Sequence, residues 1–196
     1  MRFRRSVLAL PCLLLLLSAC RDPEVRAYRV PKEKLPEPPP AAGKASPHAP
    51  AAAGAALAWQ APTHWQEREA SGFRRGSFTV PGSEGAEADL SIIAFPGQAG
   101  GLVENLNRWR GQLELPAATE SELSSDMAHI DVKSGLHFDV VDFVGTANGA
   151  PTRIVGAVVE FGGQSWFFKL MGPDALVASE KRAFLDFLQT VTPAAP

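Results

Sequence analysis

Histidine and aspartate alternate with apolar residues in the stretch HIDVKSGLHFDV, residues 129–140. A three-residue turn over Lys133-Ser134-Gly135 would fold this stretch into a hairpin. The hairpin would then set His129 opposite Asp139 and Asp131 opposite His137, with all four side chains on one face. Cβ atoms of directly opposed residues lie about 4.5–5.5 Å apart, which is close enough for imidazole–carboxylate contacts. Two imidazoles and two carboxylates in this arrangement could also hold a divalent metal.

The same hairpin has a second interpretation, in which its polar face is solvent-exposed surface. Its other face would carry five apolar side chains of the core: Ile130, Val132, Leu136, Phe138 and Val140. A zinc site generally needs supporting hydrogen bonds and a shielded pocket, and the sequence signals neither. We therefore interpret His129, Asp131, His137 and Asp139 as two exposed ion pairs, and we expect neither a metal nor a cofactor.

Catalytic motifs are scarce in the rest of the chain. No GxSxG segment occurs, so a serine hydrolase would need a triad that the sequence does not signal. The glycines of FPGQAGGLVEN, residues 95–105, could present backbone amides to an anion at the start of a helix. That segment lacks the phosphate-contacting lysine of a P-loop, and such glycines more often form a tight turn. Enzymatic activity is therefore not the expected function.

Four residues are candidates for a ligand or partner surface: Arg108, Trp109, Arg110 and Trp166. The two arginines flank Trp109 and could form a partner patch, or they could be the solvent-exposed shoulder of an amphipathic helix. Trp109 and Trp166 could line a pocket between a sheet and its helices. Lys169 interrupts an apolar strand, which requires either a place near the strand end, where its ammonium reaches water, or a buried carboxylate.

The elements that position these residues follow from apolar periodicity and turn signals. Strands are predicted at 73–80, 88–95, 128–132, 136–144, 152–161 and 164–171, with turns at Asn148-Gly149 and Gly162-Gly163. Helices are predicted at 101–113, at 120–126 with Thr119 and Glu122 as a cap, and at 174–190. Trp59 and Trp65 are expected to pin the first residues of the domain onto the core.

Consecutive strands joined by short turns predict an α+β domain with a mainly antiparallel sheet. The segment SWFFKLMG, residues 165–172, is apolar on both alternating faces, so helices should pack on both faces of the sheet. An aromatic strand followed by a closing helix with AFLDFLQTV resembles the PsbP-like fold, an α/β/α sandwich found in extrinsic photosystem proteins. The resemblance implies a binding or assembly role, and it brings over no functional residue.

The N-terminus has the features of an export signal. Three arginines precede an apolar run of about 11 residues, which is too short for a helix that must cross roughly 30 Å of hydrocarbon. Leu17-Ser18-Ala19-Cys20 resembles the lipobox of bacterial lipoproteins, which implies removal of residues 1–19 and diacylglycerol and palmitate on Cys20. Cys12 leaves with the leader, so the mature chain has no free thiol. Arg21 after Cys20 slightly favours the outer over the inner membrane.

Residues 20–56 have the composition of a flexible tether, since they are rich in proline and alanine. Residues 21–56 hold six basic and four acidic side chains, whereas residues 57–196 hold ten basic and seventeen acidic ones. An acidic domain without a basic stripe does not fit a nucleic-acid partner. We expect a single globular domain over 57–196, held at the membrane by the lipid on Cys20.

These observations predict a non-catalytic binding or assembly module, exported to the periplasm and lipid-anchored near a membrane complex. Its partner would be a membrane or periplasmic protein. The alternatives are a small-ligand carrier or hydrolase that uses a pocket between sheet and helices, and a metal-binding hairpin at His129, Asp131, His137 and Asp139.

Overall fold

A computed structural model describes residues 56–97 and 100–194. The predicted signal peptide, the lipidation site Cys20 and the predicted tether up to residue 55 lie outside the described residues. Within the described part, no helix is long and apolar enough to cross a membrane.

A seven-stranded sheet forms the centre of the domain, in the order β2-β3-β4-β8-β7-β6-β5, and every adjacent pair is antiparallel. Its strands are β2 (Gln66–Glu67), β3 (Arg74–Pro81), β4 (Glu87–Pro96), β5 (Ala128–Asp131), β6 (His137–Ala147), β7 (Ala150–Phe161) and β8 (Gln164–Pro173). The first and last short strands, β1 (Leu57–Ala58) and β9 (Thr192–Pro193), pair with each other.

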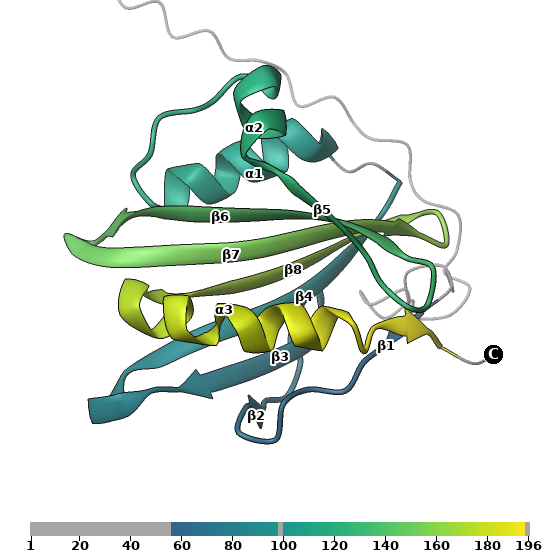
Figure 1. Ribbon diagram of the computed structural model, residues 1–196, viewed down its shortest axis with the longest axis horizontal. Helices are drawn as coiled ribbons and strands as arrows, with labels where there is room; N and C mark the ends of the chain where they lie inside the picture. The colour runs from purple at the N-terminus through teal and green to yellow at the C-terminus, as the bar shows by residue number, and fades with distance from the viewer. Residues whose placement is uncertain (1–55, 98–99, 195–196) are drawn as a thin grey trace, which may run out of the picture. The chain divides into compact units, whose positions relative to one another are not determined.

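Helices cover both faces of this sheet (Figure 1). Helices α1 (Gly101–Gln112) and α2 (Glu120–Asp126) lie on one face, and α3 (Asp174–Leu188) lies on the other. A single turn of 3-10 helix, η1 (Ser83–Gly85), joins β3 to β4. The structure therefore confirms the predicted α+β class, the antiparallel sheet and the helical layers on both faces.

Strand β8 lies fourth of the seven strands and separates two hydrophobic cores. Trp166, Phe168 and Leu170 belong to the core under α3, whereas Phe167 belongs to the core under α1. Successive side chains of a strand point to opposite faces, so a strand that is covered on both sides must be apolar at nearly every position. This requirement explains the sequence SWFFKLMG and makes Lys169 its exception.

The predicted turns and helix cap are present. Asn148 and Gly149, with φ of 52° and 76°, join β6 to β7, and Gly162 and Gly163, with φ of 61° and 71°, join β7 to β8. Two successive positive φ angles give the turn whose twist matches paired strands. Thr119 caps α2 in a reciprocal capping box with Glu122.

The first residues of the domain are anchored on the α3 side. Trp65 is buried against Phe78 and Phe187, and Trp59 packs edge-on against Phe168, which confirms the predicted role of both tryptophans. Strands β1, β2 and β9 were not predicted, because two residues are too few to show a periodicity.

Helix α3 is held to the sheet by charge as well as by apolar burial. The Arg153 guanidinium on β7 donates to Asp174 at the start of α3 (2.7 Å) and to Asp142 on β6 (2.9 Å). Lys181 of α3 donates to the same Asp142 carboxylate at 2.8 Å. Hydrogen bonding to Asp174 raises the pKa of Arg153, so this cation stays charged at any physiological pH.

Trp109 packs against a glycine of the sheet, Gly156 of β7. A Cβ atom at Gly156 of β7 would lie 2.0 Å from Cζ3 of Trp109, far inside contact distance. The glycine therefore leaves room for the indole of α1 against β7, in the core that also contains Val141 and Phe167. The position of α1 depends on this contact.

We expect Gly156→Ala to lower the free energy of unfolding by about 1–3 kcal/mol, because the added methyl group overpacks the seat of Trp109. The cost should shrink when Trp109→Leu is also present, since the ring that clashes is gone. Urea denaturation of the four variants of this cycle measures the coupling. Gly111→Ala is the control: it is exposed on α1 with no atom near its Cβ position, and it should stabilise by roughly 0.5–1 kcal/mol. Additive costs in the cycle would contradict this account.

Candidate functional site

The histidine–aspartate hairpin has the predicted turn and register. β5 and β6 pair with His129 opposite Asp139 and Asp131 opposite His137. The amide of Val132 donates to the carbonyl of Leu136, and Gly135 takes the left-handed conformation (φ 81°) that the three-residue turn requires. The opposite face of the hairpin is packed into the α3 core.

The four polar side chains form two separate pairs. Nδ1 of His129 lies 2.7 Å from Oδ1 of Asp139, and Nδ1 of His137 lies 2.5 Å from Oδ1 of Asp131. The two histidine side chains are 72% and 80% exposed, so water screens both contacts. In the described ranges, no three His, Cys, Asp or Glu side chains converge on a point that could hold a metal.

A pocket begins where this hairpin leaves the sheet. The pairing of β6 with β7 ends at Asp139 opposite Val158, yet β6 begins at His137 and β7 runs on to Phe161. The strands separate beyond that point, and a pocket of about 660 Å³ lies between them. We call it the strand-gap pocket.

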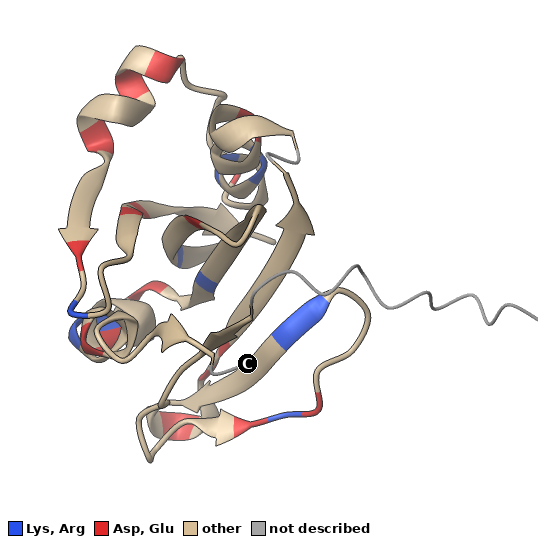
Figure 2. Ribbon diagram, turned by 90° about the vertical axis from the view of Figure 1, so that its right-hand side faces the viewer, with Lys and Arg blue, Asp and Glu red and all other residues tan. Residues whose placement is uncertain are grey.

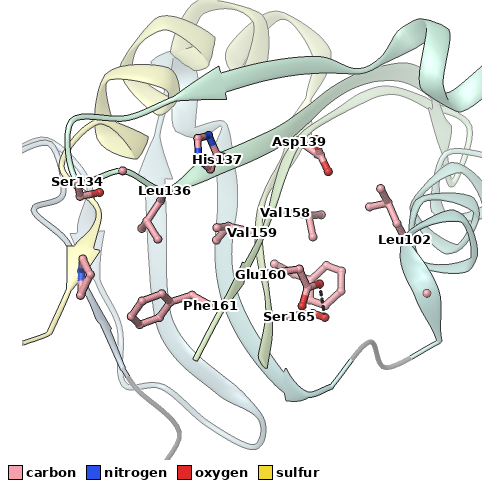
Figure 3. Close-up of a pocket in the computed structure, with 14 residues that line it drawn as sticks. Leu102, Ser134, Leu136, His137, Asp139, Val158, Val159, Glu160, Phe161 and Ser165 are labelled. Atoms are coloured by element: carbon pink, nitrogen blue, oxygen red, sulfur yellow. Dashed lines mark hydrogen bonds between the residues drawn. The ribbon is translucent and has the colours of Figure 1, made fainter. Parts of the chain in front are cut away.

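The strand-gap pocket has apolar walls and a polar rim (Figure 3). Its apolar lining comes from α1, the β5–β6 turn, β7, β8 and β9 and includes Leu102, Leu136, Val158, Val159, Phe161, Phe167 and Pro193. Its polar lining comprises Ser134, His137, Asp139, Glu160 and Ser165. Figure 3 shows His137 and Asp139 across the opening from Val158, Val159 and Glu160. The pocket thus combines apolar area with two carboxylates.

Contacts of two serines fix the walls of the strand-gap pocket. The Ser165 hydroxyl lies 2.7 Å from the carbonyl of Gly97 and 2.5 Å from a carboxylate oxygen of Glu160. The Ser134 hydroxyl, at the hairpin turn, donates to the carbonyl of Val191. Glu160 and Ser165 were not singled out in the sequence, because each is one polar residue near a strand end and only the β7–β8 register brings them together.

A second, smaller cavity of about 150 Å³ lies between α1 and the sheet, and we call it the helix cavity. Nine residues from α1, β4 and β8 line it: Ser91, Ile93, Phe95, Asn105, Arg108, Trp109, Gln112, Phe167 and Lys169. The four from α1 are spaced at i, i+3, i+4 and i+7, so they share one face of the helix. The alternative function predicted from the sequence placed Trp109 and Trp166 in a pocket between sheet and helices, and this cavity contains Trp109.

The expectation that Trp109 and Trp166 line one pocket is wrong. Trp109 belongs to the core under α1 and Trp166 to the core under α3, so the sheet separates them. Both are buried, Trp166 to 2% exposure with its indole nitrogen unpaired among the described residues. The strand period of two dictates this separation, because the neighbouring position Phe167 faces α1.

The two arginines beside Trp109 differ in their surroundings. Arg110 donates to the carbonyl of Pro116, and its guanidinium lies 5.4 Å from the ring centre of Phe143, so it serves the fold. Arg108 is exposed, and its Nη1 donates to Oδ1 of Asn105 at 2.9 Å. Arg108 therefore stays a candidate for ligand contact, at the edge of the helix cavity.

Lys169 is neither at a strand end nor paired with a buried carboxylate; it is half-buried, and its ammonium reaches the exposed side chain of Gln112. It lies in the interior of β8, and its Nζ donates to Oε1 of Gln112 at 2.9 Å, with no carboxylate within 4 Å among the described residues. Burial lowers the pKa of Lys169, and the nearby charge of Asp89 opposes that shift. A charged ammonium is thus kept against the sheet by a neutral partner.

The glycine segment between β4 and α1 serves a turn. Gly97, Gly100 and Gly101 all have positive φ, between 62° and 80°, which other residues adopt at a cost. Gly100 is the N-cap of α1 and supplies no side-chain cap. These positive φ angles account for glycine at all three positions.

No protein-family model matches this chain, and no curated protein matches it by sequence. Solved structures with a similar fold include LpqN of Mycobacterium tuberculosis, a protein involved in cell envelope biogenesis. LpqN is 13% identical with a TM-score of 0.48, and the match covers 73% of this chain and 86% of LpqN. The cyanobacterial PsbP of Synechocystis is 12% identical with a TM-score of 0.44, over 77% of this chain and 99% of PsbP.

A Bacteroides thetaiotaomicron protein is 11% identical with a TM-score of 0.44, and the match covers 71% of this chain but 45% of that one. The present chain therefore spans less than half the length of that protein. Similarity at this level of identity concerns the fold alone.

Replacing both hairpin histidines, His129→Ala with His137→Ala, should change the free energy of unfolding by less than about 1 kcal/mol, because exposed ion pairs contribute little. The purified mature chain should also bind no stoichiometric zinc, copper or nickel at neutral pH by metal analysis after dialysis. A stoichiometric metal that disappears in the double variant would overturn the surface interpretation.

Proposed function

We propose that this chain is a non-catalytic binding module of the bacterial cell envelope, anchored by lipid on Cys20. It binds a segment of a membrane or periplasmic protein in the strand-gap pocket. The observation that carries this proposal is the pocket itself, at about 660 Å³ with apolar walls and a polar rim. Binding sites are typically concave, mostly apolar and edged by a few polar groups.

Charge supports a partner segment that combines apolar and basic side chains. The domain carries seven more acidic than basic residues over 57–196, and two of its carboxylates, Asp139 and Glu160, stand at the pocket. Figure 2 shows acidic positions along α2, which has no basic residue. An acidic surface speeds the approach of a basic partner and repels acidic ones.

The surroundings of the histidines support a non-catalytic role. In the described part of the chain, His64, His129 and His137 each contact a carboxylate, and no serine or threonine hydroxyl lies within hydrogen-bonding distance of an imidazole. A hydroxyl nucleophile needs a base in such contact. The Ser165 hydroxyl, in the pocket, is engaged with Glu160 and a backbone carbonyl instead.

The N-terminal sequence supports the anchorage. A basic start, a short apolar run and the LSAC lipobox precede a segment rich in proline and alanine. Two or three acyl chains on one cysteine hold a protein on a bilayer far more firmly than one acyl chain does. A tether of 36 residues reaches at most roughly 110 Å when fully extended, so the domain can search a volume around its anchor.

A small-ligand carrier is the second candidate, because the pocket volume lies within the roughly 300–1,000 Å³ of typical small-molecule sites. The two functions differ in what is bound when the protein is isolated from cells. A carrier would bring a small molecule and no defined protein.

Lipidation is tested by labelling. Cells that express the wild-type chain should incorporate radiolabelled palmitate into it, and the protein should fractionate with membranes. Cys20→Ser should lose both, because the thiol is the only attachment point in the lipobox. Equal labelling of the two forms would refute the lipid anchor.

Partner binding is tested by photo-crosslinking in intact cells. A photoreactive residue in place of the exposed His137, at the pocket rim, should capture one defined envelope protein. The same residue in place of Arg182, exposed on α3, should not. Mass spectrometry identifies the captured protein.

Blocking the pocket gives the matched comparison. Leu102→Trp, in the pocket wall, should reduce crosslinking from position 137 by about tenfold or more, which corresponds to roughly 1.4 kcal/mol of binding free energy. Val144→Trp adds the same ring at an exposed position of β6 outside the pocket and should have no effect. No captured protein, together with a bound small molecule, would favour the carrier.

A further inference from the structure

The helix cavity has a charge composition opposite to that of the domain. Two of its lining side chains, Arg108 and Lys169, are cationic, and none is a carboxylate. Three others, Ser91, Asn105 and Gln112, carry neutral polar groups. A positive cavity in a domain with seven excess acidic residues is not explained by average composition.

The neighbouring carboxylate is shared between Lys169 and Arg74. Asp89 is the acidic residue whose charge acts on Lys169. Both of its carboxylate oxygens already accept hydrogen bonds from Arg74, at 2.8 and 2.9 Å. Arg74 also lowers the pKa of Lys169 by repulsion. Positive charge is therefore in excess here. Figure 2 shows the basic start of β3 as a blue band.

Lys169 does not contribute to folding in a way that explains its presence. Its neighbours along β8, Phe168 and Leu170, are fully buried, and an apolar residue would continue that pattern. Desolvation of the ammonium opposes folding, and a neutral amide partner offsets little of that cost. A group that weakens the fold and points into a cavity is the kind that ligand binding maintains.

An aromatic path leads from the surface to the same cavity. Phe73, before β3, is 77% exposed, and its ring centre lies 6.0 Å from that of Phe95. The ring centres of Phe95 and Phe167 lie 6.3 Å apart, and those of Phe167 and Trp109 lie 6.2 Å apart. The last three rings line the cavity. Apolar area therefore extends from the cationic cavity outward to a solvent-exposed ring.

We propose that the helix cavity binds the carboxylate group of a small amphiphilic organic acid. The Lys169 ammonium and the Arg108 guanidinium contact the carboxylate, and charged hydrogen bonds of this kind are about twice as strong as neutral ones. The apolar part of the acid lies on Phe95 and reaches toward Phe73. The cavity of about 150 Å³ holds the polar end and a few carbons, and the remainder lies along the aromatic path.

The proposed site should bind an organic acid more tightly than other small molecules. An amine is repelled by the two cations, and a neutral alcohol gains no charged hydrogen bond. Inorganic phosphate meets the cations but makes no use of the aromatic rings. The site is distinct from the strand-gap pocket, so it holds or fails independently of the proposed protein partner.

The test uses the chain from residue 20 with Cys20→Ser, so that no lipid is attached. Hexanoate and benzoate are titrated at neutral pH while the indole N–H resonance of Trp109 is followed by NMR. Acetate, inorganic phosphate, hexanol and hexylamine are the comparison probes. Hexanoate and benzoate should shift the resonance saturably, at concentrations at least about tenfold lower than any comparison probe requires.

Variants assign the two ends of the ligand. Lys169→Met and Arg108→Gln should each weaken hexanoate binding about tenfold or more, whereas Lys169→Met should raise the melting temperature because a half-buried charge is replaced by an apolar side chain. Phe73→Ser should weaken hexanoate and leave acetate unchanged. Arg182→Gln, an exposed arginine of α3 on the other face of the sheet, should change neither.

Three results would overturn the assignment: no saturable shift with any acid, equal binding of phosphate and hexanoate, or unchanged hexanoate binding in a folded Lys169→Met chain. Weaker binding by Lys169→Met could not be due to misfolding, because this variant should be more stable than the wild-type chain. Crosslinking from position 137 should persist in Lys169→Met, which separates this site from the proposed partner site.

Discussion

The burial of β8 on both faces is the constraint on which the rest of the structure depends. A strand at the centre of a seven-stranded sheet, with helices on either side, leaves no position for a polar residue without a specific partner. Two hydrophobic cores result, one under α3 and one under α1 and α2. Gly156 lets Trp109 of α1 pack closely in the second core, because it has no side chain at the position where the indole lies. The single cation of β8, Lys169, then stands out as a group that packing alone does not explain.

The pockets lie where this double covering ends. The strand-gap pocket lies at one end of the sheet, where the β5–β6 hairpin diverges from β7 and pairing stops at Asp139. The chain enters the domain at the same end, because Leu57 pairs with Pro193, a residue of the pocket wall. The helix cavity lies where α1 fails to cover β4 and β8 completely. Both are thus consequences of incomplete layers, and neither needs a strained backbone.

Charge distinguishes the two pockets. The strand-gap pocket has Asp139 and Glu160 at its opening and shares the negative sign of the domain, whereas the helix cavity contains two cations and no carboxylate. Opposite charges select different ligands from the same surroundings, because each repels what the other attracts. The two proposals therefore assign the sites to different ligand chemistries, a basic protein segment and a small organic acid. Of the exposed histidine–aspartate pairs of the hairpin, only His137 and Asp139 line the strand-gap pocket, and neither pair lines the helix cavity.

The sequence by itself determined the elements, because apolar periodicity and turn residues act locally: the helix predicted over 101–113 and found over 101–112, the capping box at Thr119 and the β5–β6 register follow from neighbours in the chain. It also determined that the central strand is covered on both faces. Only the tertiary structure decided which side chains meet. The separation of Trp109 from Trp166 by the sheet, the neutral partner of Lys169, and the meeting of Glu160 with the hairpin rim depend on contacts between residues far apart in the chain. Such contacts are set by how layers stack and where strands part, and no local pattern encodes either.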